Sequence, residues 1–285
     1  MAATVFVVGD RFAAFAEQTG ARTVSGLVAE LRAGVHDAPG GGEGGRPGEG
    51  VALVLAEGQG VSAYDWALVR DELERRGLSG RTRIVADGRG EPAGRSETHK
   101  HREQNVLVAG LTRTGERTFR AELRIHNDQE LQLDHQASHV QGMVVLEAAR
   151  QMYLAVCERH YGPDLPGRDY AYVYDKLETT FRNFLFPLDA TIECEVLAAD
   201  LSDPELLTFD IAIDFRQAGL RIAAVRIAGS GFDRALMARK EVRAAQRALR
   251  YALKHAPAAA GSEAPPADPG ALPPATGPAE LVGAG

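Results

Sequence analysis

The first ninety residues alternate short apolar runs with amphipathic segments. Continuous apolar, largely β-branched runs at residues 4–8, 51–56 and 83–86 predict three buried strands. The segments between them, at 11–18, 23–32 and 62–76, have the spacing of helices. The last of these begins with Ser62 as a cap and is followed by Gly77. This alternating order predicts a small α/β domain with a parallel sheet at residues 1–90.

From residue 97 the pattern becomes antiparallel. Two alternating segments, at 105–111 and 118–126, flank a Thr114-Gly115 turn and predict a hairpin. A long, almost wholly apolar helix follows at about 141–159. Four more strands are then expected, at 170–176, 190–199, 205–216 and 220–229. Two strands, one long helix and four strands predict an α+β domain at 97–232, an antiparallel sheet curled around a central helix.

Three segments outside these domains have compositions of their own. Residues 37–50 are rich in glycine and proline and predict a mobile loop, and residues 88–96 indicate a polar linker between the domains. Residues 233–255 predict a basic amphipathic helix. Residues 256–285 are alanine, proline, glycine and acidic residues with little to bury, which is typical of a disordered tail.

Composition narrows the class of protein. The chain has 285 residues, of which 45% are hydrophobic and 25% charged, which is typical of globular proteins. A net charge of −7 argues against general affinity for nucleic acid. The first twelve residues lack the basic region of a secretory signal, and no apolar run approaches ~18 residues, so we expect a cytoplasmic protein that does not engage a membrane. Cys157 and Cys194 are too few for a disulfide framework or a metal set.

A nucleotide site in the α/β domain is disfavoured. Gly9 follows the first strand, where a phosphate-binding turn would lie, but it stands alone and forms no G-x-G-x-x-G motif. The glycines at 40–45 follow no strand and precede no Lys-Ser/Thr pair. We therefore expect no cofactor, and the pattern favours a docking or scaffolding role for this domain.

The central helix carries two charges among its apolar residues. Glu147 and Arg150 lie three residues apart, so they are neighbours on one helix face and could pair. If the helix is enclosed, both charges lose water and are tolerated only with partners, which makes them candidates for function. The alternative is an ordinary ion pair at an exposed edge of the helix, contributing ~0.5 kcal/mol or less.

The stretch from His139 to Gln151 resembles the signature helix of the A-factor biosynthesis (AfsA-type) hotdog family. That family carries a near-identical His-Val-x-Gly-Met-Val-x-Leu-Glu-Ala-Ala-Arg-Gln run. Upstream, His99-Lys100 and residues 103–106 resemble the segment that opens a repeat in this family. The resemblance implies a hotdog fold over residues 97–232. Family members often carry two such repeats, and residues 1–90 do not look like a second one.

The resemblance also implies a chemistry. Similar hotdog domains bind acyl thioesters of coenzyme A or acyl carrier protein, with the substrate carbonyl at the N-terminus of the central helix, near the Gly142 N–H. The implied reaction is transfer of a β-ketoacyl group to a hydroxylated three-carbon phosphate, on the route to butyrolactone signals. Glu147 would be the general base, and Arg150 would tune its pKa or bind the phosphate or thioester oxygen.

The sequence also allows other functions and other roles for these residues. A carrier-protein dehydratase or thioesterase would require His135 instead of Arg150, and a non-catalytic hotdog subunit would only bind an acyl group or a partner. Arg182 and Asn183 could line the mouth of an acyl tunnel or form a plain polar turn. His139 is more simply a cap or loop hydrogen-bonder, and no metal site is expected because His135 and His139 lack a clear third ligand.

Two partners are predicted. A single hotdog sheet leaves an edge strand unpaired and half of an acyl site unformed, so we expect a homodimer through this domain. Arg243, Arg247 and Arg250 form part of a basic stripe along the C-terminal helix, which would suit an acidic acyl carrier protein. The alternatives are a solvated helix face or a clamp on the acidic tail.

Overall fold

The structure is a computed structural model, which describes residues 3–37, 53–86, 90–126, 137–162 and 169–254. The chain divides into one compact unit up to Met237 and a second from Ala238 onwards. The predicted loop at 37–50 falls almost wholly outside the described residues, as does the predicted tail at 256–285. No helix in the described ranges is long and apolar enough to cross a membrane.

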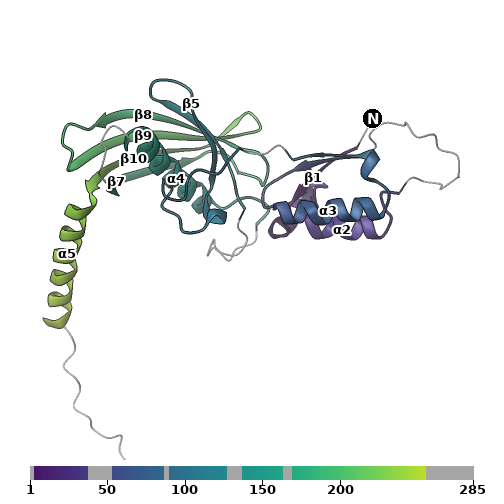
Figure 1. Cartoon of the computed structure of the whole chain (residues 1–285), viewed down its shortest axis with the longest axis horizontal. Helices are drawn as coiled ribbons and strands as arrows, with labels where there is room; N and C mark the ends of the chain where they lie inside the picture. The colour runs from purple at the N-terminus through teal and green to yellow at the C-terminus, as the bar shows by residue number, and fades with distance from the viewer. Residues whose placement is uncertain (1–2, 38–52, 87–89, 127–136, 163–168, 255–285) are drawn as a thin grey trace, which may run out of the picture. The chain divides into compact units, whose positions relative to one another are not determined.

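The N-terminal region is a four-stranded parallel sheet in the order β2-β1-β3-β4. Thr23 accepts a hydrogen bond from Gly26 N at the start of α2, and Ser62 and Asp65 form a capping box on α3. Helices α2 and α3 lie side by side along this sheet (Figure 1). The elements are β1 (Ala3–Val8), η1 (Asp10–Phe12), α1 (Ala13–Thr19), β2 (Arg22–Thr23), α2 (Val24–Arg32), β3 (Leu53–Glu57), α3 (Ala63–Arg75), η2 (Ser79–Arg81) and β4 (Thr82–Val85). The predicted parallel α/β pattern is confirmed.

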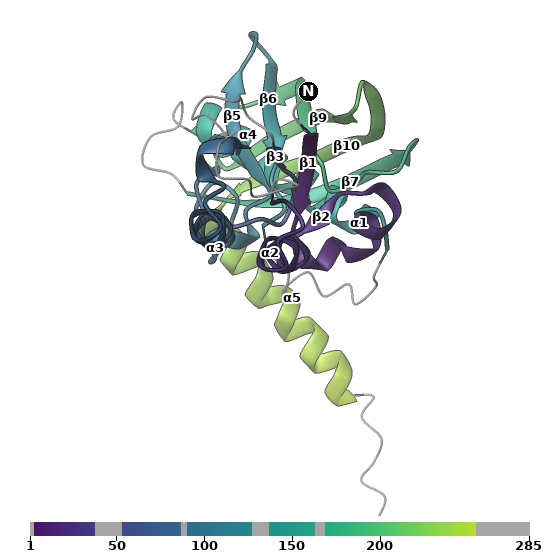
Figure 2. The same ribbon diagram turned by 90° about the vertical axis from the view of Figure 1, so that its right-hand side faces the viewer.

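The second region is a six-stranded antiparallel sheet in the order β5-β6-β8-β9-β10-β7, with a long helix, α4, against one face (Figures 1 and 2). In chain order it contains η3 (Glu103–Asn105), β5 (Val108–Arg113), β6 (Thr118–Leu123), α4 (Gly142–His160), β7 (Tyr170–Phe181), β8 (Thr191–Asp200), β9 (Leu206–Gln217) and β10 (Leu220–Asp233). The predicted order of two strands, one helix and four strands is confirmed. Strands β5 and β7 form the two edges.

Strand β10 continues past Gly229, where the sequence predicts its end. Glycine is disfavoured inside strands, which is why the predicted strand stops there. In the structure a bulge separates Ala228 from Gly229, and a Cβ on Gly229 would lie 2.7 Å from the Tyr153 hydroxyl oxygen. The glycine is therefore the residue that lets α4 approach the sheet closely.

A single hydrophobic core fills the space between α4 and the antiparallel sheet. Its largest fully buried side chains include Tyr153, Phe119 and Phe215. Phe12 and Phe15 of the N-terminal region belong to the same cluster, whereas α2 and α3 pack over a second one. The N-terminal region therefore contributes residues to the core of the antiparallel sheet and also has a second core of its own beneath α2 and α3.

A buried glutamine ties the α/β region to the antiparallel sheet. The Gln59 side chain donates to Leu123 O at 2.9 Å and accepts from Ile125 N at 2.7 Å, while its backbone N–H donates to Pro187 O. A buried amide satisfied on both its donor and acceptor sides fixes the geometry around it. Separate folding of residues 1–90 stays a prediction. The hydrogen bonds of Gln59 with Leu123 and Ile125 argue against it.

Part of the predicted linker at 88–96 is tied to the sheet. Pro92 forms a β-bridge with Ala109, and Glu91 O accepts a hydrogen bond from Gly110 N at 2.9 Å. Residues 91–93 thus run alongside β5, and only residues 88 and 89 of this stretch lie outside the described residues. The chain is therefore held against the sheet before it reaches the central helix.

Candidate functional site

The N-terminus of α4 lies close to the end of strand β7. Val140 N donates to Leu185 O at 2.7 Å, which pins the chain just before the helix, and Gln141 has extended backbone at the cap position. A Cβ on Gly142 would lie 2.9 Å from the Phe181 ring, so glycine provides the space between helix and strand. The first N–H groups of an α-helix have no partner within it, and they favour an oxygen carrying negative charge.

A cavity of about 480 Å³ lies at this helix end. It falls within the size range of small-molecule sites. All four residues that the sequence predicts for binding line it, together with apolar side chains: His139, Val140, Gly142, Val145, Phe181, Arg182, Asn183, Phe184, Leu185 and Ile222. The structure therefore gathers the predicted binding residues around one cavity.

Two polar residues of the cavity, Asn183 and His139, are held by neighbouring groups. The Asn183 side-chain amide donates to Arg221 O at 2.7 Å, and the His139 ring lies 4.7 Å from the Phe184 ring, centroid to centroid. Phe181 and Phe184 are 52% and 65% exposed. Exposed aromatic side chains beside a cavity are typical of a surface that binds an apolar ligand or partner.

Further along α4, the carboxylate of Glu147 accepts four contacts. Arg150 binds it with both arms, Nε to Oε2 at 2.8 Å and Nη2 to Oε1 at 2.9 Å. Gln151 Nε2 donates to Oε1 at 3.0 Å. Lys100 Nζ lies 2.5 Å from the same oxygen. The pair that the spacing of Glu147 and Arg150 indicates is present, and it is part of a larger cluster.

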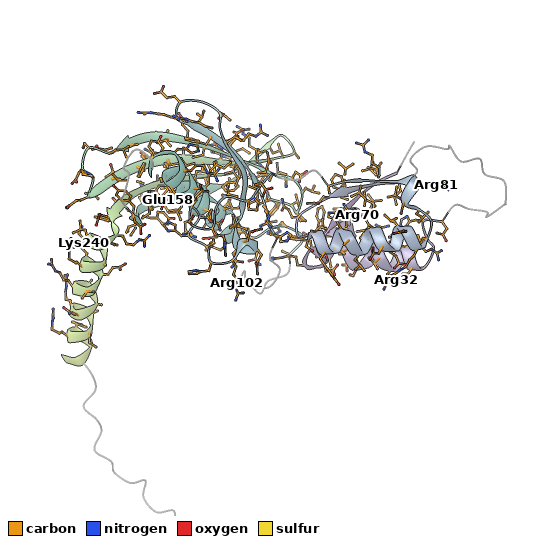
Figure 3. All side chains as sticks on the ribbon, in the orientation of Figure 1. Arg32, Arg70, Arg81, Arg102, Glu158 and Lys240 are labelled. Atoms are coloured by element: carbon orange, nitrogen blue, oxygen red, sulfur yellow. The ribbon has the colours of Figure 1, made fainter. Side chains whose placement is uncertain are left out.

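Lys100 reaches this cluster from residues 91–107, which we call the strap. Glu97 and Arg159 form a two-armed ion pair at 2.6 and 2.9 Å. His99 Nε2 lies 3.0 Å from Oε1 of Glu158, a residue of α4 labelled in Figure 3. Gln151 also accepts from Leu107 N at 2.7 Å and donates to Asn105 O at 2.9 Å. The strap is therefore bound along the side of α4 by several independent polar contacts.

These contacts determine the charge of Glu147. Burial opposes its ionisation, but the hydrogen bonds that its carboxylate accepts, from Arg150 and Lys100 above all, outweigh this and lower its pKa to about 2. The hydrogen bond to Glu147 raises the pKa of Arg150. Beside them, burial raises the pKa of Tyr174 to about 12. The cluster thus contains one carboxylate and two cations at neutral pH.

A carboxylate in this state is a poor general base. A base is most effective when its pKa lies near the working pH, and the pKa of Glu147 lies far below neutrality. The four donors also occupy most of the roughly four lone-pair positions that a carboxylate offers. In the arrangement observed, Glu147 holds Arg150 and Lys100 in position. Neither Glu147 nor Arg150 lines the cavity at the start of α4.

Of the two histidines considered as site residues in the sequence, His135 and His139, the structure describes only His139. His139 lines the cavity, whereas His135 lies outside the described residues. Within the described ranges, no three His, Cys, Asp or Glu side chains come close enough to hold a metal ion. A role for His135 in dehydration or hydrolysis stays a prediction.

The family follows from a match over the region just described. The model of the A-factor biosynthesis hotdog domain matches residues 86–233, just over half of the chain. The chain belongs to this family. The matched region contains the strap, the central helix and all six strands of the antiparallel sheet, and the N-terminal α/β region lies almost wholly outside it.

Solved structures similar to this AfsA-type chain match it at low identity. A thioesterase from Haemophilus influenzae is 12% identical over 43% of this chain and 77% of its own, with a TM-score of 0.29. A hypothetical thioesterase with coenzyme A from Streptococcus pneumoniae is 12% identical over 43% and 84%, with a TM-score of 0.30. A conserved protein from Pseudomonas aeruginosa is 14% identical over 46% and 99%, with a TM-score of 0.31. No curated protein matches the chain.

The sequence analysis did not identify Lys100 as a partner of Glu147 in the AfsA-type domain. It lies forty-seven positions before Glu147 in a segment without regular secondary structure, so no periodicity connects the two. Its neighbour His99 has a φ of +52°, in the left-handed region that is uncommon for residues other than glycine. The signal that could have found Lys100 was the His99-Lys100 pair in the family resemblance.

Proposed function

We propose that this protein binds an acyl thioester at the N-terminus of α4 and transfers the acyl group to a hydroxylated acceptor. The observation that carries the proposal is the cavity at that helix end, which has largely apolar walls. The first N–H groups of an α-helix have no partner within the helix and favour an oxygen that carries negative charge. The thioester comes from coenzyme A or from an acyl carrier protein. The family membership supports a β-ketoacyl donor and a three-carbon phosphate acceptor.

The residues divide the work as follows. The acyl chain lies against Phe181 and Phe184, and the thioester carbonyl oxygen receives hydrogen bonds from the first N–H groups of α4. Donors directed at an oxygen that gains negative charge during acyl transfer stabilise the transition state. The acceptor hydroxyl oxygen attacks the carbonyl carbon, an ester C–O bond forms, the C–S bond breaks, and the thiolate takes up the proton that the hydroxyl releases.

The two halves of this site come together in a dimer. The Glu147 cluster and the cavity are separate features of one protomer, and the aromatic residues of the cavity lie at the end of edge strand β7. Pairing of two β7 edges would cover an unpaired strand and the exposed rings at once. Sedimentation at micromolar concentration should show a dimer, and a stable monomer would refute this arrangement.

The test of the proposed function is a panel of acyl-carrier and acyl-CoA thioesters, incubated with the protein with and without dihydroxyacetone phosphate and followed by intact mass. Acyl transfer predicts loss of the thioester and a new ester only when the acceptor is present. Loss of thioester without acceptor would favour a thioesterase. A mass decrease of one water on a β-hydroxyacyl carrier would favour a dehydratase, and no turnover with tight binding would favour a non-catalytic subunit.

A further inference from the structure

Within the described residues, the Lys100 ammonium has more N–H donors than it uses. Its ammonium offers three N–H groups. The contact that the structure records for it is the ion pair with Glu147 Oε1. Its side chain is 24% exposed, so it is neither fully solvated nor enclosed. A partly dehydrated ammonium with donors to spare is suited to binding a negatively charged ligand atom.

Holding the strap in place is not a sufficient role for Lys100. The strap is already bound to α4 by Glu97 with Arg159, by His99 with Glu158, and by both sides of the Gln151 amide. A fourth contact adds little to a segment fixed at three other points. The Lys100 contact does bring a second cation to Glu147, whose carboxylate already accepts hydrogen bonds from Nε and Nη2 of Arg150.

The cluster as a whole has a charge to neutralise. Arg150 and Lys100 contribute two positive charges and Glu147 one negative charge, which leaves a net charge of +1 in a partly buried setting. All three side chains are about one quarter exposed, so a ligand can reach them from solvent. A partly buried net charge is stabilised by a counter-charge, and the chemical group that fits is a single oxyanion.

We propose that Lys100 and Arg150 form an oxyanion-binding site for the acidic group of the acceptor substrate, a phosphate monoester or a carboxylate, and that Glu147 is the positioning residue that holds both cations. Binding of the anion draws Lys100 from Glu147 Oε1 and frees an acceptor position on that carboxylate. The acceptor hydroxyl could then donate to the freed oxygen. The site therefore recognises the acceptor and places its hydroxyl in a single step.

This inference rests on the proposed acyl transfer for its biological meaning, but it can be tested without any thioester. The probe is inorganic phosphate, with acetate as the carboxylate arm, titrated into the full chain and followed by calorimetry and by NMR of the lysine side chains. We expect millimolar affinity for at least one anion in the wild-type protein. Lys100→Met should weaken it at least about tenfold, because it removes a charge-assisted hydrogen bond, whereas Lys100→Arg should retain it.

The matched control is Lys176→Met on strand β7. Lys176 also pairs with a glutamate, Glu178 at 2.6 Å, but that pair is exposed, at 64% and 54%. Its removal should leave anion binding unchanged. Equal affinities in wild type, Lys100→Met and Lys176→Met would overturn the proposal, as would the absence of anion binding to the wild type.

Folding of the variants is checked by melting temperature. Lys100→Gln, which keeps an N–H donor and loses the charge, is the second variant should Lys100→Met fail to fold. Failure of both to fold would make Lys100 a structural residue and overturn the proposal. Anion binding that depends on Lys100 in a protein that binds no thioester would instead leave this site standing and refute the proposed function.

Discussion

The start of α4, at Gly142, and the turns that follow, at Glu147 and Arg150, have opposite chemistry. At Gly142 the helix begins beside a cavity that is lined by exposed phenylalanines. At Glu147 and Arg150, one to two turns later, every charge is paired across short distances and tied to the strap. The first region is suited to taking up an apolar ligand with a polarised carbonyl, and the second to holding charges in a fixed pattern. Under the proposed function, the start of α4 binds the acyl donor and the Glu147 cluster binds the acceptor.

The largest expected effect comes from the charged region. Glu147→Gln keeps the volume of the side chain but removes the charge that holds Arg150 and Lys100 together. Turnover should fall at least about a hundredfold, because the loss of one positioned electrostatic partner in an active site has effects of that order. Steady-state rates with the acyl thioester and acceptor measure this. Near-normal turnover of a folded Glu147→Gln variant would mean that the cluster is structural. It would favour the hypothesis that the protein is a non-catalytic subunit that only binds an acyl group or a partner.

The second prediction concerns stability in acid. Because the pKa of Glu147 is about 2 in the folded chain and near 4.5 when unperturbed, its stabilising contribution is complete above pH 4.5 and is lost as the pH falls through 2. The full shift corresponds to on the order of 3 kcal/mol in the free energy of unfolding. Denaturant titrations between pH 6 and pH 2 should show this loss in the wild type and a flatter curve in Glu147→Gln. Parallel curves would mean that the carboxylate is not held ionised by its neighbours.

The third prediction concerns the cavity. Phe184→Ala removes an exposed ring from its wall without opening the core, since Phe184 is 65% exposed. We expect thioesters with long acyl chains to bind about tenfold more weakly, equivalent to ~1.4 kcal/mol of lost apolar contact. Thioesters with an acetyl group should be little affected. The matched control is Leu220→Ala at the β9–β10 turn, a comparably exposed apolar residue that is not among those lining the cavity. Equal losses for both variants would remove the cavity from the binding site.

Local patterns predicted most of this fold, and distant contacts explain what they missed. Alternation and apolar runs identified the strands, and Ser62 and Thr23 marked where two helices begin, because these signals lie within a few residues of each other. The pairing of Glu147 with Arg150 was predictable for the same reason. The contacts of Lys100 and Gln59 were not, since each joins segments far apart in the sequence. Edge strand β2 was missed because it has only two residues.

The smallest expected effect is at the C-terminal helix, α5 (Arg234–Lys254). Arg243, Arg247 and Arg250 are exposed and lie on one side of it, and Lys240, labelled in Figure 3, projects from the same helix. We propose that this stripe attracts an acidic acyl carrier protein, because opposite charges raise the rate of encounter. Val242 and Leu249 are 56% and 60% exposed on another side of α5, where they could contact the same partner.

Reversing the three arginines to glutamate should lower turnover of carrier-bound substrate about fivefold at low salt, which is ~1 kcal/mol, and much less at high salt, where charges are screened. Small thioester analogues should react at the wild-type rate, because they carry no protein partner to steer. The matched control reverses Arg70, Arg81 and Arg83 of the α/β region, which changes the net charge by the same amount. Equal losses for both triple variants would attribute the effect to overall charge. Equal losses for carrier-bound and small thioesters would mean that α5 supports the fold, and only a loss confined to the carrier and to α5 identifies the helix as its docking site.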